Sequence, residues 1–149
     1  RLIIATGSSP FVPPVEGADL KGVISFRDIY DVNTMIKYCE TKKNAVVIGG
    51  GLLGLEAAYG LKQRGMNVTV LHLMDRIMER QLDGRASRML RQSIEQKGIN
   101  IIKHTYNYDL SGSVDYNYDF EYVLTAANRW ANKQIDDFTL ILYLTIDYQ

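Results

Sequence analysis

A glycine-rich stretch at residues 45–61, AVVIGGGLLGLEAAYGL, constrains the fold of this 149-residue chain more than any other segment. Residues 45–48 are apolar without alternation, as in a parallel strand that is buried on both faces. Gly49, Gly51 and Gly54 follow in the pattern G-x-G-x-x-G, and a helical sequence begins directly after them. A strand, a tight glycine turn and a helix in this order open a parallel strand–helix–strand unit.

The segments after this helix continue the same alternation. Gly65 is placed to end the first helix, and Asp83 is placed to cap the N-terminus of a second helix. Strands that alternate with helices predict an α/β domain of Rossmann-like type, with three layers and a parallel sheet. The expected helices are 52–64 and 84–97, and the expected strands are 67–73 and 99–103. The inner stripe expected for the second helix is Ala86, Met89, Leu90, Ser93 and Ile94.

The flanking segments carry weaker signals. Short apolar runs at 2–5, 23–26 and 140–146 predict strands, and apolar residues spaced along 31–40 predict one more helix. Tyrosines alternate with polar residues from 106 to 122 around a Ser-Gly-Ser turn, which predicts an antiparallel hairpin or β-meander. A tyrosine-rich low-complexity tail is the alternative interpretation of that segment.

The composition argues against several classes of function. The chain has 17 Lys and Arg against 17 Asp and Glu, and this zero formal charge gives no reason to expect a nucleic-acid partner. No apolar run approaches the roughly 20 residues of a membrane span, so we expect no membrane association and a cytoplasmic protein. The single cysteine, Cys39, excludes a disulfide framework and cannot hold a metal cluster; we expect it to be a small buried hydrophobe.

Each glycine of the turn has a role that a side chain would obstruct. Gly49 permits the tight turn, Gly51 lets the backbone approach a pyrophosphate, and Gly54 lets the helix lie close to the strand. The first N–H groups of the helix have no intrahelical partner, and the helix dipole adds positive charge beside them. The turn therefore predicts a dinucleotide site at residues 49–54, with a purely structural glycine turn as the alternative.

The end of the next strand is where such sites recognise the adenosine ribose, commonly through Asp or Glu about 20 residues after the glycines. His72 occupies that position and brings no fixed negative charge, and Arg76 could pair with a 2′-phosphate. Asp75 could instead accept hydrogen bonds from the ribose. The pattern favours dual or NADP-tolerant use, and the structural alternative is a rim His72 with a solvated Arg76.

Three segments together resemble the pyridine-nucleotide–disulfide oxidoreductase superfamily of FAD flavoproteins. They are the A-T-G-S segment at 5–8 with the proline linker after it, GGGLLGLEAA at 49–58, and the strand 68–72. Within this superfamily the resemblance is strongest to the large-subunit family of assimilatory NAD(P)H-dependent nitrite reductases, in the order and spacing of residues 52–83.

A second motif resembles the superfamily in part. The sequence VLTAANRWAN at 123–132 is similar to V-L-x-A-x-G-R-x-P-N, but Asn128 stands where glycine is usual and Ala131 where proline is usual. Because the resemblance weakens after residue 103, we expect residues 105–149 to be either a diverged or a damaged edge of the domain. The resemblance implies the end of an FAD-binding domain and a proline linker at 1–17, an NAD(P)H-binding domain at 18–135, and a return segment or tail at 136–149.

The resemblance also implies roles for particular residues. Thr6 and Gly7 would lie near FAD at the domain junction, and Asn128 would lie beside the nicotinamide nucleotide. Glu56, in the first turn of the glycine-loop helix where the dipole favours negative charge, would lie near the nicotinamide. No catalytic side chain and no metal ligand is implied. The residues expected to hold the NAD(P)H pyrophosphate are Gly49, Gly50, Gly51, Leu52, Leu53 and Gly54.

The implied reaction is hydride transfer from NAD(P)H to FAD, with the FAD bound mostly by a domain outside this chain. Besides the nicotinamide dinucleotide, the implied partners are that FAD domain and the iron–sulfur and sirohaem domains of a nitrite reductase. Because the sequence opens within a strand-like run, we expect a fragment that binds NAD(P)H without completing the reaction. The alternatives are a non-catalytic or degenerate nucleotide-binding fragment, a sister reductase acting on rubredoxin or ferredoxin, and a plain Rossmann dehydrogenase.

Overall fold

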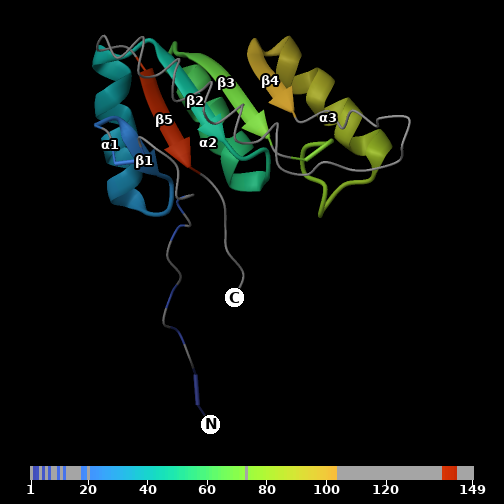
Figure 1. Ribbon diagram of the computed structural model, residues 1–149, viewed down its shortest axis with the longest axis horizontal. Coiled ribbons are helices and arrows are strands. Elements are labelled where there is room, and N and C mark those ends of the chain that lie inside the picture. Colours follow the sequence, from blue (N-terminus) through green and yellow to red (C-terminus); the bar gives the residue numbers. More distant parts are fainter. Residues whose placement is uncertain are drawn as a thin grey trace, which may run out of the picture.

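The computed structural model describes residues 21–72, 74–103 and 139–143, together with residues 2, 3, 5, 7, 10, 12, 18 and 19 (Figure 1). Strands and helices alternate along this part of the chain, and every element predicted between residues 23 and 103 is present, with ends within two residues of the prediction. The elements are β1 (Val23–Ser25), α1 (Ile29–Thr41), β2 (Asn44–Ile48), α2 (Leu52–Gln63), β3 (Asn67–His72), α3 (Gly84–Gln96), β4 (Ile99–Lys103) and β5 (Thr139–Tyr143).

The five strands form one sheet in the order β1-β5-β2-β3-β4. The run predicted at 140–146 is β5, and it lies between β1 and β2, where Val23 pairs with Ile141 and Ala45 pairs with Leu140. Every pairing among the described strands is parallel, which confirms the Rossmann-like α/β prediction. The antiparallel meander predicted at 106–122 lies outside the described residues.

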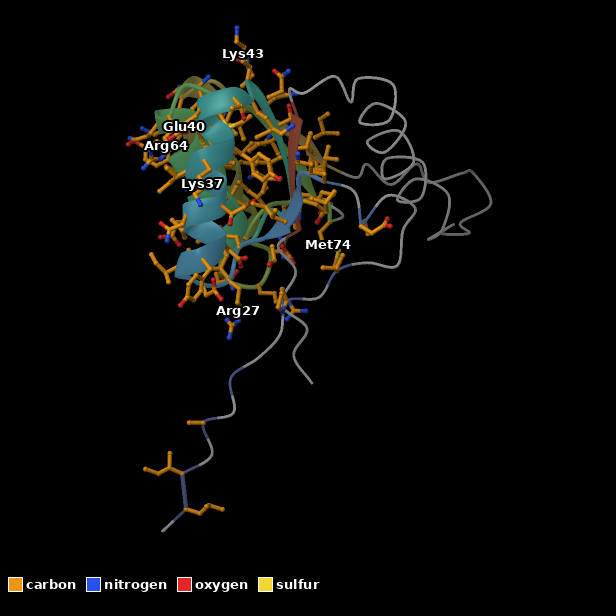
Figure 2. The ribbon with its side chains drawn as sticks, turned by 90° about the vertical axis from the view of Figure 1, so that its left-hand side faces the viewer. Arg27, Lys37, Glu40, Lys43, Arg64 and Met74 are labelled. Atoms are coloured by element: carbon orange, nitrogen blue, oxygen red, sulfur yellow. The ribbon has the colours of Figure 1, made fainter. Side chains whose placement is uncertain are left out.

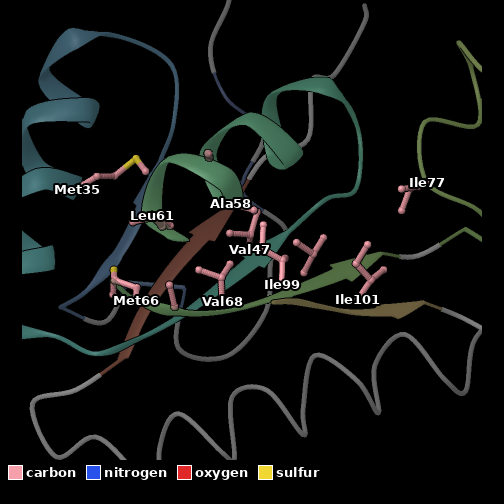
Figure 3. Close-up of a cluster of buried hydrophobic side chains, with 12 residues drawn as sticks. Met35, Val47, Ala58, Leu61, Met66, Val68, Ile77, Ile99 and Ile101 are labelled. Carbon is pink, nitrogen blue, oxygen red and sulfur yellow. The ribbon is translucent and has the colours of Figure 1, made fainter. Parts of the chain in front are cut away.

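The core lies where α1 and α2 meet one face of the sheet (Figure 3), and Leu90 and Ile94 of α3 pack against it. Val47 of β2 pairs with Val70 of β3, and Val70 pairs with Ile101 of β4. Residues paired across parallel strands point to the same side of the sheet, and these three belong to the core cluster. Met35 from α1 and Leu61 from α2 pack into the same cluster, and burying a side chain of this size contributes about 1.5–3 kcal/mol. The sheet and this helix layer are two of the three predicted layers, and the described residues do not test the third.

Helix α1 covers one side of the sheet, as the edge-on view of Figure 2 shows. Lys37 and Glu40 are exposed on its outer side, while Met35 is 6% exposed on its inner side. The helix begins two residues earlier than predicted because Asp28 caps it. The Asp28 carboxylate accepts from the N–H groups of Tyr30 at 2.8 Å and Asp31 at 3.0 Å.

The two helices of the central unit end as their sequences predict. Gly65 has φ 85° after α2, and its N–H donates to Lys62 O at 3.0 Å while Met66 N–H donates to Leu61 O at 3.2 Å. This pair of bonds is a Schellman motif, in which glycine adopts the left-handed conformation without strain. At the start of α3, the Asp83 carboxylate accepts from Ala86 N–H at 2.8 Å, so the predicted N-cap is confirmed.

Two predictions about packing are wrong. The run at 2–5 forms no strand at its described positions, and Leu2 and Ile3 are 84% and 88% exposed, because no described strand lies beside them to take their hydrogen bonds. On α3 the inner face is centred on Ser87, whereas Met89, which is 62% exposed, and Ser93, which is also exposed, do not belong to it. Leu90 and Ile94 do face the core, as predicted.

Candidate dinucleotide site at the glycine turn

The glycine turn connects β2 to α2 at the carboxyl edge of the parallel sheet. Gly49 has φ 121°, a conformation that side chains rarely adopt, and its N–H donates to Leu71 O of β3 at 2.8 Å. A Cβ added to Gly54 would lie 2.9 Å from the carbonyl carbon of Gly49, and closer still to its oxygen. The backbone of α2 therefore lies directly on the turn, as expected for the first and last glycines of the motif.

The third glycine in the run leaves open space at the start of the helix. Gly51 is the N-cap of α2, its backbone is extended, and a Cβ built on it would meet nothing within 4 Å. The first helical bond is Leu55 N–H to Gly51 O at 3.0 Å, so the N–H groups of Leu52, Leu53 and Gly54 precede the helical ladder. These donors, with the positive end of the helix dipole, fit the diphosphate of a dinucleotide.

The middle glycine is held by the loop after β3. Gly50 N–H donates to His72 Nδ1 at 3.0 Å, and Gly50 O accepts from Met78 N–H at 3.0 Å. A Cβ on Gly50 would lie 2.8 Å from His72 Cγ and 3.0 Å from Ile77 Cγ2. Both polar groups of Gly50 are thus committed to the protein, and only a glycine leaves room for the imidazole.

His72 stands at the end of β3, as predicted, but its ring is turned into the protein. The side chain is 8% exposed. Because Nδ1 accepts from Gly50, the proton lies on Nε2, which donates to Arg76 O at 2.9 Å and to Glu79 Oε2 at 3.1 Å. Both ring nitrogens are therefore engaged by groups of the chain itself.

Asp75 and Arg76 are exposed and lie in the segment between β3 and α3. Arg76 Nη1 lies 4.0 Å from the position of a Cβ built on Gly84, the first residue of α3. The carbonyl of Asp75 accepts from Lys103 Nζ at 2.6 Å, which ties the loop to the end of β4. Asp75 and Arg76 are therefore exposed charged side chains within four residues of His72, the position expected to bind the ribose.

Glu56 corrects one expectation. It is the fifth residue of α2, and no acidic residue lies in the first turn, so the helix dipole does not account for its charge. Its exposed side chain instead lines a cavity of about 220 Å³ between α1 and α2, together with Arg64, Met35 and Cys39.

Burial raises the pKa of the Cys39 thiol, whose Sγ lies 3.4 Å from Met66 Sδ.

The remaining predicted residues are Thr6, Gly7 and Asn128. Thr6 and Asn128 lie outside the described residues, and Gly7, with φ 77°, has nothing within 4 Å of a built Cβ. Within the described ranges, no three His, Cys, Asp or Glu side chains are grouped to hold a metal ion. No helix in the same ranges has the length and apolar character needed to cross a bilayer.

Three residues with structural roles were missed by sequence reasoning. Glu79 accepts from His72, Met78 supports Gly50 with a backbone of φ 54°, and buried Ser87 donates from Oγ to Ile77 O at 2.8 Å. All three hold the irregular segment between β3 and α3, where the sequence has no periodicity. The one local signal concerned Ser87. It precedes Leu90 by three residues and Ile94 by seven, so it lies on the same face of α3 as these two apolar residues.

Several known proteins with differently named activities are similar to this chain. A nitrite reductase [NAD(P)H] of Bacillus subtilis is 50% identical over 112 residues, which are 75% of this chain and 14% of that protein. The assimilatory nitrate reductase electron transfer subunit of the same organism is 46% identical over 113 residues, 76% of this chain and 15% of that protein. Among solved structures, a NAD-dependent persulfide reductase from A. fulgidus matches with a TM-score of 0.64 and 32% identity, covering 73% of this chain and 21% of that one.

The chain thus spans only a small part of the length of these relatives. The profile of the pyridine nucleotide-disulphide oxidoreductases matches residues 1–129, which include the whole glycine turn and the strands on either side of it. On this match, and with a Rossmann-like sheet that carries the turn at its carboxyl edge, the chain belongs to the pyridine nucleotide-disulphide oxidoreductase family.

Proposed function

We propose that this chain is the NAD(P)H-binding module of a flavoprotein oxidoreductase, and that its glycine turn holds the dinucleotide pyrophosphate. The observation that carries the proposal is the open space at Gly51 beside the first N–H groups of α2. A Cβ would project into this space, and a diphosphate would find there backbone donors and a helix dipole of the right sign.

The chain's own contribution is to bind and orient. Gly49 and Gly54 bring the backbone of α2 against the turn, which fixes the direction of its N–H groups. When bound, the nicotinamide supplies the hydride that the family's FAD accepts. Glu56, exposed on α2, is proposed to lie near the nicotinamide. Thr6 and Gly7 are proposed to lie near FAD at the domain junction, and Asn128 beside the nicotinamide nucleotide.

The enzyme we propose around this module is a nitrite reductase large subunit. The identity of 50% to the Bacillus subtilis nitrite reductase supports this assignment. In the gene that encodes this chain, it requires a second G-x-G-x-x-G upstream for FAD and a cysteine cluster downstream for an iron–sulfur centre. Their absence from that gene would refute the assignment while leaving the nucleotide site intact.

A second candidate is a reductase that passes electrons to a separate carrier protein. It is favoured by the 46% identity to a protein named as an electron transfer subunit of nitrate reductase. Such a gene would carry the upstream glycine fingerprint and lack the sirohaem domain, so the same gene sequence separates the two candidates.

Nucleotide binding is tested by titrating the full chain with NADH and with NADPH, using the nucleotide fluorescence as the signal. We expect saturable binding, and Gly51→Ala should weaken it by tenfold or more because its Cβ enters the space of the pyrophosphate. Gly60→Ala is the matched control, since it makes the same change in the same helix with nothing within 4 Å. Absence of binding of either nucleotide at millimolar concentration would refute the module.

A further inference from the structure

We propose that His72 is a positioning residue for the glycine turn, acting as a neutral bridge between Gly50 and the 76–79 loop, and that it does not contact the nucleotide. The inference rests on the proposed function, because it concerns how the same turn is held ready. It also assigns recognition of the adenosine ribose or its 2′-phosphate to the exposed Arg76 and Asp75 rather than to the residue that ends β3.

The geometry of the imidazole supports this role at three points. Nδ1 accepts from Gly50 N–H at 3.0 Å, and Nε2 donates to Arg76 O at 2.9 Å and to Glu79 Oε2 at 3.1 Å. A neutral histidine has one acceptor and one donor nitrogen, so this network uses both. With 8% of the side chain exposed, no further polar edge of the ring is presented to a ligand.

The consequence for the turn follows from the two bonds of Gly50. Its N–H is directed inward to His72 and its C=O receives Met78 N–H, so the peptide groups on both sides of Gly50 have fixed orientations. The next residues, Gly51 and Leu52, begin α2 from that fixed point. Loss of the Nδ1 acceptor would leave a largely buried N–H unsatisfied, and the turn would relax away from the geometry that presents its donors.

The groups around the ring match a tautomer whose Nδ1 accepts and whose Nε2 donates. Glu79 is the acidic partner, with 24% of its side chain exposed, and Arg76 contributes its carbonyl oxygen rather than its guanidinium. Other dinucleotide sites commonly have Asp or Glu at the position of His72, where it binds the ribose. Here such a carboxylate would lie close to the Glu79 carboxylate, and the two negative charges would repel each other.

Two substitutions separate the halves of the bridge. In His72→Asn, the side-chain oxygen lies as many bonds from the backbone as Nδ1 and can still accept from Gly50, but the reach to Glu79 is lost. In His72→Gln, the amide reaches the Nε2 position and can donate to Glu79, but no acceptor remains for Gly50. Glu79→Ala is a third variant that leaves His72 itself unchanged, and circular dichroism verifies that each variant is folded.

The experiment measures NADH and NADPH affinity and the hydrogen exchange of the Gly50 amide in the full chain without nucleotide. We expect His72→Gln to bind both nucleotides about tenfold more weakly and His72→Asn to stay within about threefold of the unsubstituted chain. The Gly50 amide should exchange slowly in the unsubstituted chain and in His72→Asn, and faster in His72→Gln. Glu79→Ala should lower the affinity for NADH and the affinity for NADPH by the same factor.

Each other outcome has a defined meaning. A variant at 72 that changes the ratio of NADPH to NADH affinity by more than about threefold would overturn the proposal, since it would make His72 a ribose reader. Equal Gly50 exchange in all variants would overturn it as well. If the unsubstituted chain binds neither nucleotide, the proposed function fails, and the exchange measurement by itself still decides whether His72 holds Gly50.

Discussion

Replacing Gly54 with alanine tests whether the close approach of α2 to the glycine turn is as tight as the structure shows. The added Cβ would lie 2.9 Å from the carbonyl carbon of Gly49 and nearer to its oxygen, whereas the next atom, Val47 Cγ1, is at an unstrained 3.7 Å. The obstacle is backbone, and Gly49 is itself held by its bond to Leu71 O. Relief therefore requires the start of α2 to move away from β2.

The magnitude follows from comparison with Gly60→Ala. Both substitutions lie in α2, so the gain of about 1 kcal/mol in helix propensity is common to both and cancels in the difference. At Gly60 a Cβ meets nothing within 4 Å, whereas at Gly54 it overpacks a fixed carbonyl. Overpacking a core costs about 1–3 kcal/mol, so Gly54→Ala should be less stable than Gly60→Ala by that amount.

Urea unfolding followed by circular dichroism measures this difference in the free energy of unfolding. We expect Gly60→Ala to unfold at a higher urea midpoint than the unsubstituted chain, and Gly54→Ala at a lower midpoint, with similar slopes. A Gly54→Ala chain that is as stable as Gly60→Ala would refute the close packing of helix on turn and, with it, the geometric role given to the third motif glycine.

Two further predictions concern the rest of the core. Ser87→Ala should lower the free energy of unfolding, measured in urea melts, by about 1–3 kcal/mol, because it leaves the carbonyl of Ile77 without its buried donor. The control is Ser93→Ala, which should have almost no effect because Ser93 is exposed. Equal effects of the two substitutions would contradict the prediction. Burial raises the pKa of the Cys39 thiol, so less thiolate is present at pH 8, and a thiol reagent should react more slowly with the folded chain than with the urea-unfolded chain. Equal rates in the two states would contradict that reasoning.

The central unit could be predicted because its signals are local. An unbroken apolar run marked β2, three spaced glycines marked the turn, and single residues marked the helix ends: Gly65 closed α2 and Asp83 opened α3. Each of these depends on the conformation of a few neighbouring residues, which the sequence specifies directly.

The parts that could not be predicted depend on distant contacts. The environment of His72 is set by a loop that returns to place Glu79 against the ring, and no repeating pattern marks that loop. For the same reason, the sequence grouped Gly50 with the pyrophosphate-binding residues, whereas its N–H and C=O are both bonded within the protein and the imidazole lies 2.8 Å from its built Cβ. The position of β5 within the sheet is equally non-local, because a strand-like run does not indicate its neighbours.

The position of β5 has a consequence for how the chain acquires its fold. Strand β5 pairs on one side with β1 and on the other with β2, and no pairing joins β1 directly to β2. During synthesis, β2, β3 and β4 can assemble with α2 and α3 from contiguous chain, while β1 must wait until residues 139–143 have left the ribosome. Pairing strands that lie so far apart in the sequence is slow, so assembly of this edge should limit the folding rate. A chain truncated before residue 139 would keep its glycine turn and lose the strand that holds β1 to the sheet.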